Sequence, residues 1–226
     1  MSRFVALMES AAFKDTRKPK AYFTKYLTEQ RKRIADKMVK LKDADAEKKQ
    51  RILTSLIGQC IDLMKAEFSA GTSTADLKKI LTSMLLVCGE YKKATYDDLV
   101  NLLALAVVLH CNASKLIASN KQTISSDRLL DYLANATKGN AVWDNTLKLN
   151  PVYTALNTVF DSEQPEFALL SYLDGWYKAH SASSWYESHK RDTDTYCGYW
   201  SFEAAAVAKI LKLDESAIDS EYYPKF

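Results

Sequence analysis

The sequence predicts an all-α protein, a multi-helix bundle of about eight helices around one central buried helix. Apolar residues recur at helical spacing through most of the 226 residues, and no stretch shows the apolar–polar alternation of a strand. Gly (6) and Pro (4) are too scarce for the many tight turns of an all-β protein. With 47% apolar and 26% charged residues, the chain has the composition of an ordinary globular protein.

The central helix is predicted at residues 99–109, where Asn101 is the single polar residue in the run LVNLLALAVVL. A helix that is apolar on every side belongs in a protein interior or a membrane, and this run has about half of the roughly 20 residues that span a bilayer. Thr95 and Asp98 form a capping-box pattern at its start. We therefore expect this helix at the centre of a soluble domain.

The remaining helices follow from apolar stripes and capping residues, and short connections make neighbouring helices antiparallel. A short apolar segment and a basic lead-in occupy residues 1–18, and a polar, aromatic loop is expected at 181–196. The first expected helix covers about 20–41. The second is capped by Asp43 or Asp45 and ends at Gly71, and the third starts at Ser73, which forms a capping-box pattern with Asp76. The later helices are expected at 127–136, capped by Ser125 or Ser126, and at 151–160, 167–180 and 202–213. An N-terminal half (1–120) and a C-terminal half (121–226) are expected to pack as one body.

Charge is divided unevenly along the chain, whose net charge is +3. Residues 1–94 carry 20 Lys and Arg against 11 Asp and Glu, a net of +9, and residues 95–226 carry 11 against 17, a net of −6. Three interpretations fit this division: solvated helix faces, a basic face for nucleic acid, or an acidic face for a basic partner.

Cysteine usage and the N-terminus predict the compartment. Cys60, Cys88, Cys111 and Cys197 are widely spaced and form no CxxC motif, which favours a reducing compartment and no zinc knuckle. The first 18 residues lack the uninterrupted apolar region of a signal peptide, and no stretch is long and apolar enough to span a membrane. We expect a cytoplasmic protein without a membrane partner.

No catalytic motif is found: the chain has no Gly-rich phosphate loop, no GxSxG and no HExxH. His180 and His189 with Cys197 offer a candidate metal site, but their spacing fits no zinc pattern. Asp192 and Asp194 could pair as acid and base, although DTD in a polar stretch is typical of a turn. The prediction is a protein that is not an enzyme and needs no cofactor or metal, and an unrecognised hydrolase is the alternative.

Basic residues are dense in the first predicted helix, where RKR (31–33) is followed by Lys37, Lys40 and Lys42. Nucleic-acid binding would need such a stripe, preferably with exposed aromatic residues for stacking. Here Tyr22, Phe23 and Tyr26 share the apolar face, and acids interrupt the basic run. A solvated face is favoured, and nucleic-acid binding through the basic N-terminal half stays as an alternative function.

The last third of the chain has distinctive motifs: YLDGWY (172–177), WYESHK (185–190), YCGYWSFEAAA (196–206) and YYP (222–224). These motifs resemble the PoNi family, the immunity proteins of bacterial PoNe-type DNase toxins, and TYDDLV (95–100) resembles the N-terminal half of that family. The resemblance implies an immunity protein that binds and neutralises a cognate antibacterial DNase toxin, a type VI secretion or polymorphic toxin effector, in the bacterial cytoplasm. It implies no nucleic-acid contact and leaves the oligomeric state open.

The motif residues also have a physical interpretation, which is mainly structural. Gly198 permits a close approach or a positive φ before the last helix, and Glu203 in its first turn complements the helix dipole. The aromatic residues bring large apolar areas that can anchor a short helix or form an interface. The motif residues with such a role are Trp176, Tyr177, Trp185, Gly198, Tyr199, Trp200, Phe202 and Glu203.

Candidate contacts to the toxin are acids of the C-terminal half. A DNase active site attracts phosphate and is therefore electropositive, so an inhibitor that occludes it gains from negative charge. Each of these acids can equally be a solvated loop or helix-start residue. The candidates are Asp161, Glu163, Glu166, Glu187, Asp192 and Asp194.

Overall fold

The computed structural model describes residues 13–89, 91 and 94–226, and its fold is all-α, as predicted. The described residues form ten α-helices (α2–α11) and three 3-10 helices (η1–η3), and their only β feature is an isolated bridge between Asp127 and Lys148. The ten α-helices exceed the expected eight because segment 114–124 forms two further short helices, and the first part of the helix expected at 151–160 is a 3-10 helix. The apolar segment expected at the N-terminus falls mostly in residues 1–12, outside the described part.

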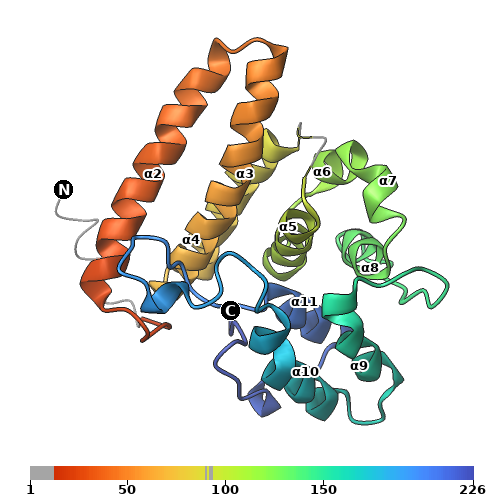
Figure 1. Ribbon diagram of the computed structural model, residues 1–226. Helices are drawn as coiled ribbons and strands as arrows, with labels where there is room; N and C mark the ends of the chain where they lie inside the picture. Colours follow the sequence, from red (N-terminus) through yellow and green to blue (C-terminus); the bar gives the residue numbers. More distant parts are fainter. Residues whose placement is uncertain (1–12, 90, 92–93) are drawn as a thin grey trace.

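Three helices of the N-terminal half begin the fold: α2 (Lys20–Lys42), α3 (Ala46–Ser69) and α4 (Thr74–Cys88). Figure 1 shows α2 and α3 as a long hairpin with α4 behind it. Of the two predicted caps for α3, Asp45 is the one used, because its side chain accepts a hydrogen bond from the Lys48 amide at 2.8 Å. Ser73 caps α4 as predicted, by accepting from the Asp76 amide at 3.2 Å.

Helix α5 (Tyr96–Leu109) starts with the predicted capping box, in which both the Thr95 and the Asp98 side chains accept backbone hydrogen bonds. Its residues 99, 100 and 102–109 are all buried. Asn101 satisfies its own amide by donating to the Asp97 carbonyl oxygen at 2.8 Å. The helix packs against α3, α4, α8 and α11, so apolar side chains are covered on every side.

The C-terminal half is built from short helices: α6 (Ser114–Ser119), α7 (Lys121–Ile124), α8 (Arg128–Ala136), η1 (Pro151–Leu156), α9 (Asn157–Asp161), α10 (Pro165–Ala179), η2 (Ser188–Lys190), α11 (Phe202–Leu211) and η3 (Glu215–Ala217). The prediction that Ser125 or Ser126 caps α8 is wrong. Asp127 is the cap, accepting from the Leu130 amide at 3.1 Å. Its carboxylate also accepts from the Tyr96 hydroxyl and the Asn150 amide, which hold it in place.

The halves are joined by side-chain and backbone contacts as well as by the shared core. Helix α11 packs on α5, and the loop before α11 crosses to the base of α2 and α3 (Figure 1). There the Tyr22 hydroxyl donates to the Tyr196 carbonyl oxygen and accepts from the Tyr196 amide, both at 2.9 Å. Buried apolar residues of both halves belong to one core cluster. None of the helices in the described part is long and apolar enough to cross a bilayer.

Candidate functional site

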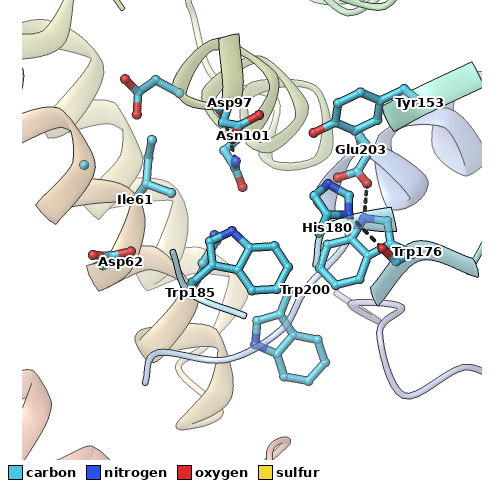
Figure 2. Close-up of a pocket in the computed structure, with 13 residues that line it drawn as sticks. Ile61, Asp62, Asp97, Asn101, Tyr153, Trp176, His180, Trp185, Trp200 and Glu203 are labelled. Atoms are coloured by element: carbon cyan, nitrogen blue, oxygen red, sulfur yellow. Dashed lines mark hydrogen bonds between the residues drawn. The ribbon is translucent and has the colours of Figure 1, made fainter. Parts of the chain in front are cut away.

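A cavity of about 150 Å³ lies between α3, α5 and the C-terminal end of α10. Figure 2 shows Asp62 on one side, Asp97 and Asn101 on α5 above, and Glu203 beside Trp176 on the other side. Segments that are far apart in sequence therefore meet here, and the N-terminal and C-terminal halves each supply part of the wall. The lining residues are Gly58, Ile61, Asp62, Lys65, Asp97, Asp98, Asn101, Tyr153, Trp176, His180, Trp185, Trp200 and Glu203.

Glu203 is the most deeply buried acid of this wall, with 4% of its surface exposed. Its Oε1 accepts hydrogen bonds from the Tyr172 hydroxyl (2.7 Å), the Trp176 indole N–H (2.6 Å) and the Ser201 hydroxyl (2.6 Å). No Lys, Arg or His of the described residues forms an ion pair with it. The sequence indicates Glu203 only as a partner of the helix dipole, whereas the fold makes it a buried carboxylate facing a cavity.

The N-terminal half contributes three further acids. Asp98 is occupied by the capping box, and Asp97 is exposed, with no hydrogen-bond or ion-pair partner for its carboxylate among the described residues. Asp62 is partly buried, and the Cys197 thiol donates to its Oδ1 at 3.6 Å. Burial raises the pKa of Asp62, an effect that the positive charge of Lys65 opposes.

Aromatic rings form the rest of the wall. Trp176 stacks on Trp185 with ring centroids 5.5 Å apart, and the Trp200 indole N–H donates to Ser69 Oγ at 2.8 Å. The Lys65 ammonium lies 5.7 Å from the Trp185 ring centroid, within the range of a cation–π contact. The cavity is thus bounded by indole faces as well as by carboxylates.

Tyr153 reports the electrostatic character of the cavity. Burial raises the pKa of its hydroxyl well above the usual value, and the negative charges of Glu203 and then Asp97 raise it further. The charges of Glu203 and Asp97 thus make the electrostatic potential at the Tyr153 hydroxyl more negative. The same potential favours a positively charged group in the cavity.

The six acids predicted as toxin contacts fall into two groups along the chain. Asp161, Glu163 and Glu166 lie where α9 passes into α10, whereas Glu187, Asp192 and Asp194 lie in the loop after α10. The first group lies at the start of α10, a helix of 15 residues that is about 22 Å long, and the second group follows the end of this helix in the sequence. Glu187 pairs with Lys190 and Asp194 with Lys25, while Asp161, Glu163 and Asp192 are exposed.

None of these six acids lines the cavity, and sequence reasoning missed Asp62 and Asp97 as parts of a site. The sequence indicates Asp97 only as a helix-start acid. Asp62 follows Ile61 of an apolar stripe, and no sequence pattern marks it as part of a functional site. The motif residues Trp176, Trp185, Trp200 and Glu203 do line the cavity, so the motif was the usable signal.

The remaining motif residues pack around the same region. Tyr199 and Phe202 are buried, Tyr177 is partly buried, and Gly198 has a φ of +116°. The Tyr199 hydroxyl lies 2.9 Å from His189 Nδ1 and accepts from the His189 amide at 3.2 Å. The motif therefore holds the loop before α11 against the wall of the cavity.

The residues of the alternative metal site have separate partners. His180 Nδ1 lies 2.8 Å from the Trp176 carbonyl oxygen, His189 is held by Tyr199, and Cys197 contacts Asp62. Burial raises the pKa of the Cys197 thiol well above its usual value, and the charge of Asp62 adds to this effect. The described residues contain no group of three or more His, Cys, Asp or Glu that could hold a metal ion.

Several residues of the basic stripe on α2 are engaged within the fold. Arg31 Nε and Nη2 donate to Oε1 of the buried Glu67 at 3.0 and 2.5 Å. Arg33 pairs with Glu29 at 3.2 Å, and the Lys37 ammonium donates to Ser55. Arg31 therefore stabilises the helix hairpin, and its charge is not freely available to a partner.

Two comparisons with known proteins gave matches, one for the sequence of the C-terminal half and one for the fold. Residues 125–226 match the family model described as PoNe immunity proteins (PoNi), C-terminal. The fold resembles the crystal structure of protein PA2201 from Pseudomonas aeruginosa, with a TM-score of 0.66 and 18% sequence identity over 96% of this chain and 90% of that one. No curated protein sequence matches the chain. The family resemblance seen in the sequence motifs is confirmed for this region.

The buried position of Asp62 leads to a prediction about stability. A raised pKa in the folded state means that folding favours the protonated acid, so the wild-type protein loses stability as pH rises above the ordinary value of about 4. Asp62→Asn removes this loss. Its stability relative to wild type should increase from pH 4 to pH 7, as measured by urea unfolding at both values. Asp192→Asn, on an exposed loop, is the control, and an equal effect of Asp62→Asn at both pH values would contradict the assignment.

Proposed function

Because residues 125–226 match the C-terminal family model of PoNe immunity proteins, we propose that this chain binds and neutralises a cognate PoNe-type nuclease toxin. Neutralisation by binding needs no chemistry from the immunity protein. A nuclease is blocked where its DNA substrate lies, which places the interaction in the bacterial cytoplasm. The toxin is then an effector of type VI secretion or of a polymorphic toxin system.

Occlusion of the toxin's active site is the mechanism that the charge distribution supports. An enzyme that cleaves DNA must attract a phosphate backbone and so presents positive charge. Residues 95–226 of this chain have a net charge of −6, and Asp161, Glu163 and Asp192 among them are exposed. Opposite charges accelerate the encounter of two proteins and fix their orientation.

The direct test is inhibition of the cognate nuclease toxin. DNA cleavage should fall linearly as the immunity protein is added and should stop at one equivalent. A lethal enzyme must stay inhibited at low free concentration, so a Kd of about 1 nM or less is expected, equivalent to roughly −12 kcal/mol. Undiminished cleavage at saturating immunity protein would refute the proposal.

The contribution of surface acids is tested by association kinetics with a catalytically inactive toxin. Glu163→Lys with Glu166→Lys should lower the on-rate, and the wild-type on-rate should fall with salt because screening shortens to about 8 Å at physiological ionic strength. The matched control is Lys32→Glu with Lys40→Glu, at two exposed positions of α2. Arg31 is unsuitable as a control, since its loss would leave Glu67 buried without a cation. Slower association for the control pair alone would place the contact on the N-terminal half.

A further inference from the structure

We propose that the cavity between α3, α5 and α10 is a receptor for an arginine side chain of the toxin. The inference rests on the proposed immunity function and specifies the chemistry of the contact. An arginine needs compensating negative charge, flat surfaces for its guanidinium plane, and room for its head group. Each of these is present in the cavity.

The charge of the cavity wall is strongly negative. Four acidic residues, Asp62, Asp97, Asp98 and Glu203, line the cavity, against one lysine, Lys65. Glu203 is the decisive residue because it is buried and has no cationic partner within the described part of the chain. Its three hydrogen-bond donors all reach Oε1, and Oε2 accepts no hydrogen bond from the described residues.

The aromatic wall favours a guanidinium over an ammonium. Guanidinium is planar and weakly hydrated, so it stacks on aromatic faces and binds carboxylates through several N–H groups at once. Trp176 and Trp185 present stacked indole rings, and Lys65 already lies over the Trp185 ring. The cavity volume of about 150 Å³ is several times the roughly 10–15 Å³ that admits one water, so the cavity has room for a larger group such as the end of an arginine side chain.

An arginine side chain in this cavity would serve as an anchor of the interface with the toxin. Arginine is enriched among residues that dominate binding energy, and such residues fill desolvated pockets in the partner. A DNA-cleaving toxin has basic side chains at its phosphate-binding surface. A toxin arginine held in this cavity could not contact DNA. Binding of the toxin would therefore also inhibit its DNA cleavage.

The first experiment uses a small probe, N-acetyl-arginine amide, without the toxin. Three of the four tryptophans, Trp176, Trp185 and Trp200, line the cavity, so intrinsic fluorescence reports its occupancy. Trp143, stacked on Phe160 elsewhere, supplies the constant background. Saturable binding is expected for the arginine probe, with weaker binding of the lysine analogue. Equal responses to the arginine and the neutral citrulline probes, or no response up to the solubility limit, would overturn the proposal.

Three variants change the charge of the cavity wall: two remove a negative charge and one removes a positive charge. Asp97→Asn should weaken probe binding about two- to fivefold, as expected for an exposed charge pair, and Glu203→Gln by about tenfold or more, as expected for a buried one. Lys65→Gln removes the competing cation and should tighten binding. Asp36→Asn, at an exposed position of α2 outside the cavity, is the matched control. Because a purely structural role would make every variant weaker, failure of Lys65→Gln to tighten binding would overturn the charge argument.

The same variants, measured against the inactive toxin, separate this inference from the proposed function. Weaker toxin binding by Asp97→Asn and Glu203→Gln, with tighter binding by Lys65→Gln, supports an arginine of the toxin as the occupant. Unchanged toxin affinity in all three variants overturns that occupant while the immunity function stands. If the wild-type protein does not bind the toxin, the proposed function is refuted. The probe titration then shows whether the cavity binds arginine.

Discussion

Replacing Leu103 and Leu105 together by alanine should produce a protein that no longer unfolds cooperatively. Both side chains are fully buried in α5, and residues two positions apart lie on different faces of a helix, so each substitution opens a separate cavity. Each buried Leu→Ala change costs about 2–5 kcal/mol. The sum is comparable to the whole stability of a typical domain, about 5–15 kcal/mol. Thermal unfolding followed by near-UV circular dichroism should show loss of the sharp transition.

The matched control for this variant is the same leucine-to-alanine substitution at an exposed position. Leu86→Ala in α4 removes the same atoms from a side chain that is 61% exposed, so its effect should stay within about 0.5 kcal/mol. A double variant in α5 that unfolds with the same midpoint and cooperativity as wild type would show that α5 is not needed for the folded core.

Local signals were sufficient to predict the longer helices and several of their starts. The caps at Ser73 and Thr95 depend on residues within the same turn, so the sequence contains all the required information. The cap of α8 depends on tertiary contacts, since Asp127 is also bonded by the Tyr96 hydroxyl and the Asn150 amide. A one-dimensional pattern could not rank Asp127 above Ser125 and Ser126.

The candidate site could be predicted only in part, because its wall comes from both halves of the chain. The motif indicated Trp176, Trp185, Trp200 and Glu203, which lie within 28 positions of one another in the sequence. Asp62 is more than 100 residues away and reaches the cavity only because α3 packs on α5. Charge counting over two segments of the chain likewise selected acids that lie outside the cavity.

Gly198→Ala should destabilise the protein more than the same change at Gly139 or Gly175, and it should do so by two separate effects. The backbone at Gly198 has a φ of +116°, a conformation that L side chains rarely adopt, and such strain costs about 1–3 kcal/mol. A Cβ at this position would also clash with Ser69 Oγ and the indole nitrogen of Trp200. Those two atoms are joined by a 2.8 Å hydrogen bond that ties the loop before α11 to the end of α3.

The other two glycines separate these effects. Gly139 has a φ of +80° with open space around its Cβ position, so Gly139→Ala measures the backbone strain alone. Gly175 lies within α10 with similar open space, and Gly175→Ala should stabilise the protein by about 0.5–1 kcal/mol. The excess cost of Gly198→Ala over Gly139→Ala, measured by urea unfolding, is therefore the cost of the lost close approach plus the difference in backbone strain between φ of +116° and +80°. If the two variants cost the same, the loop can move away from Ser69, and the contact is not required for the position of Trp200 in the cavity wall.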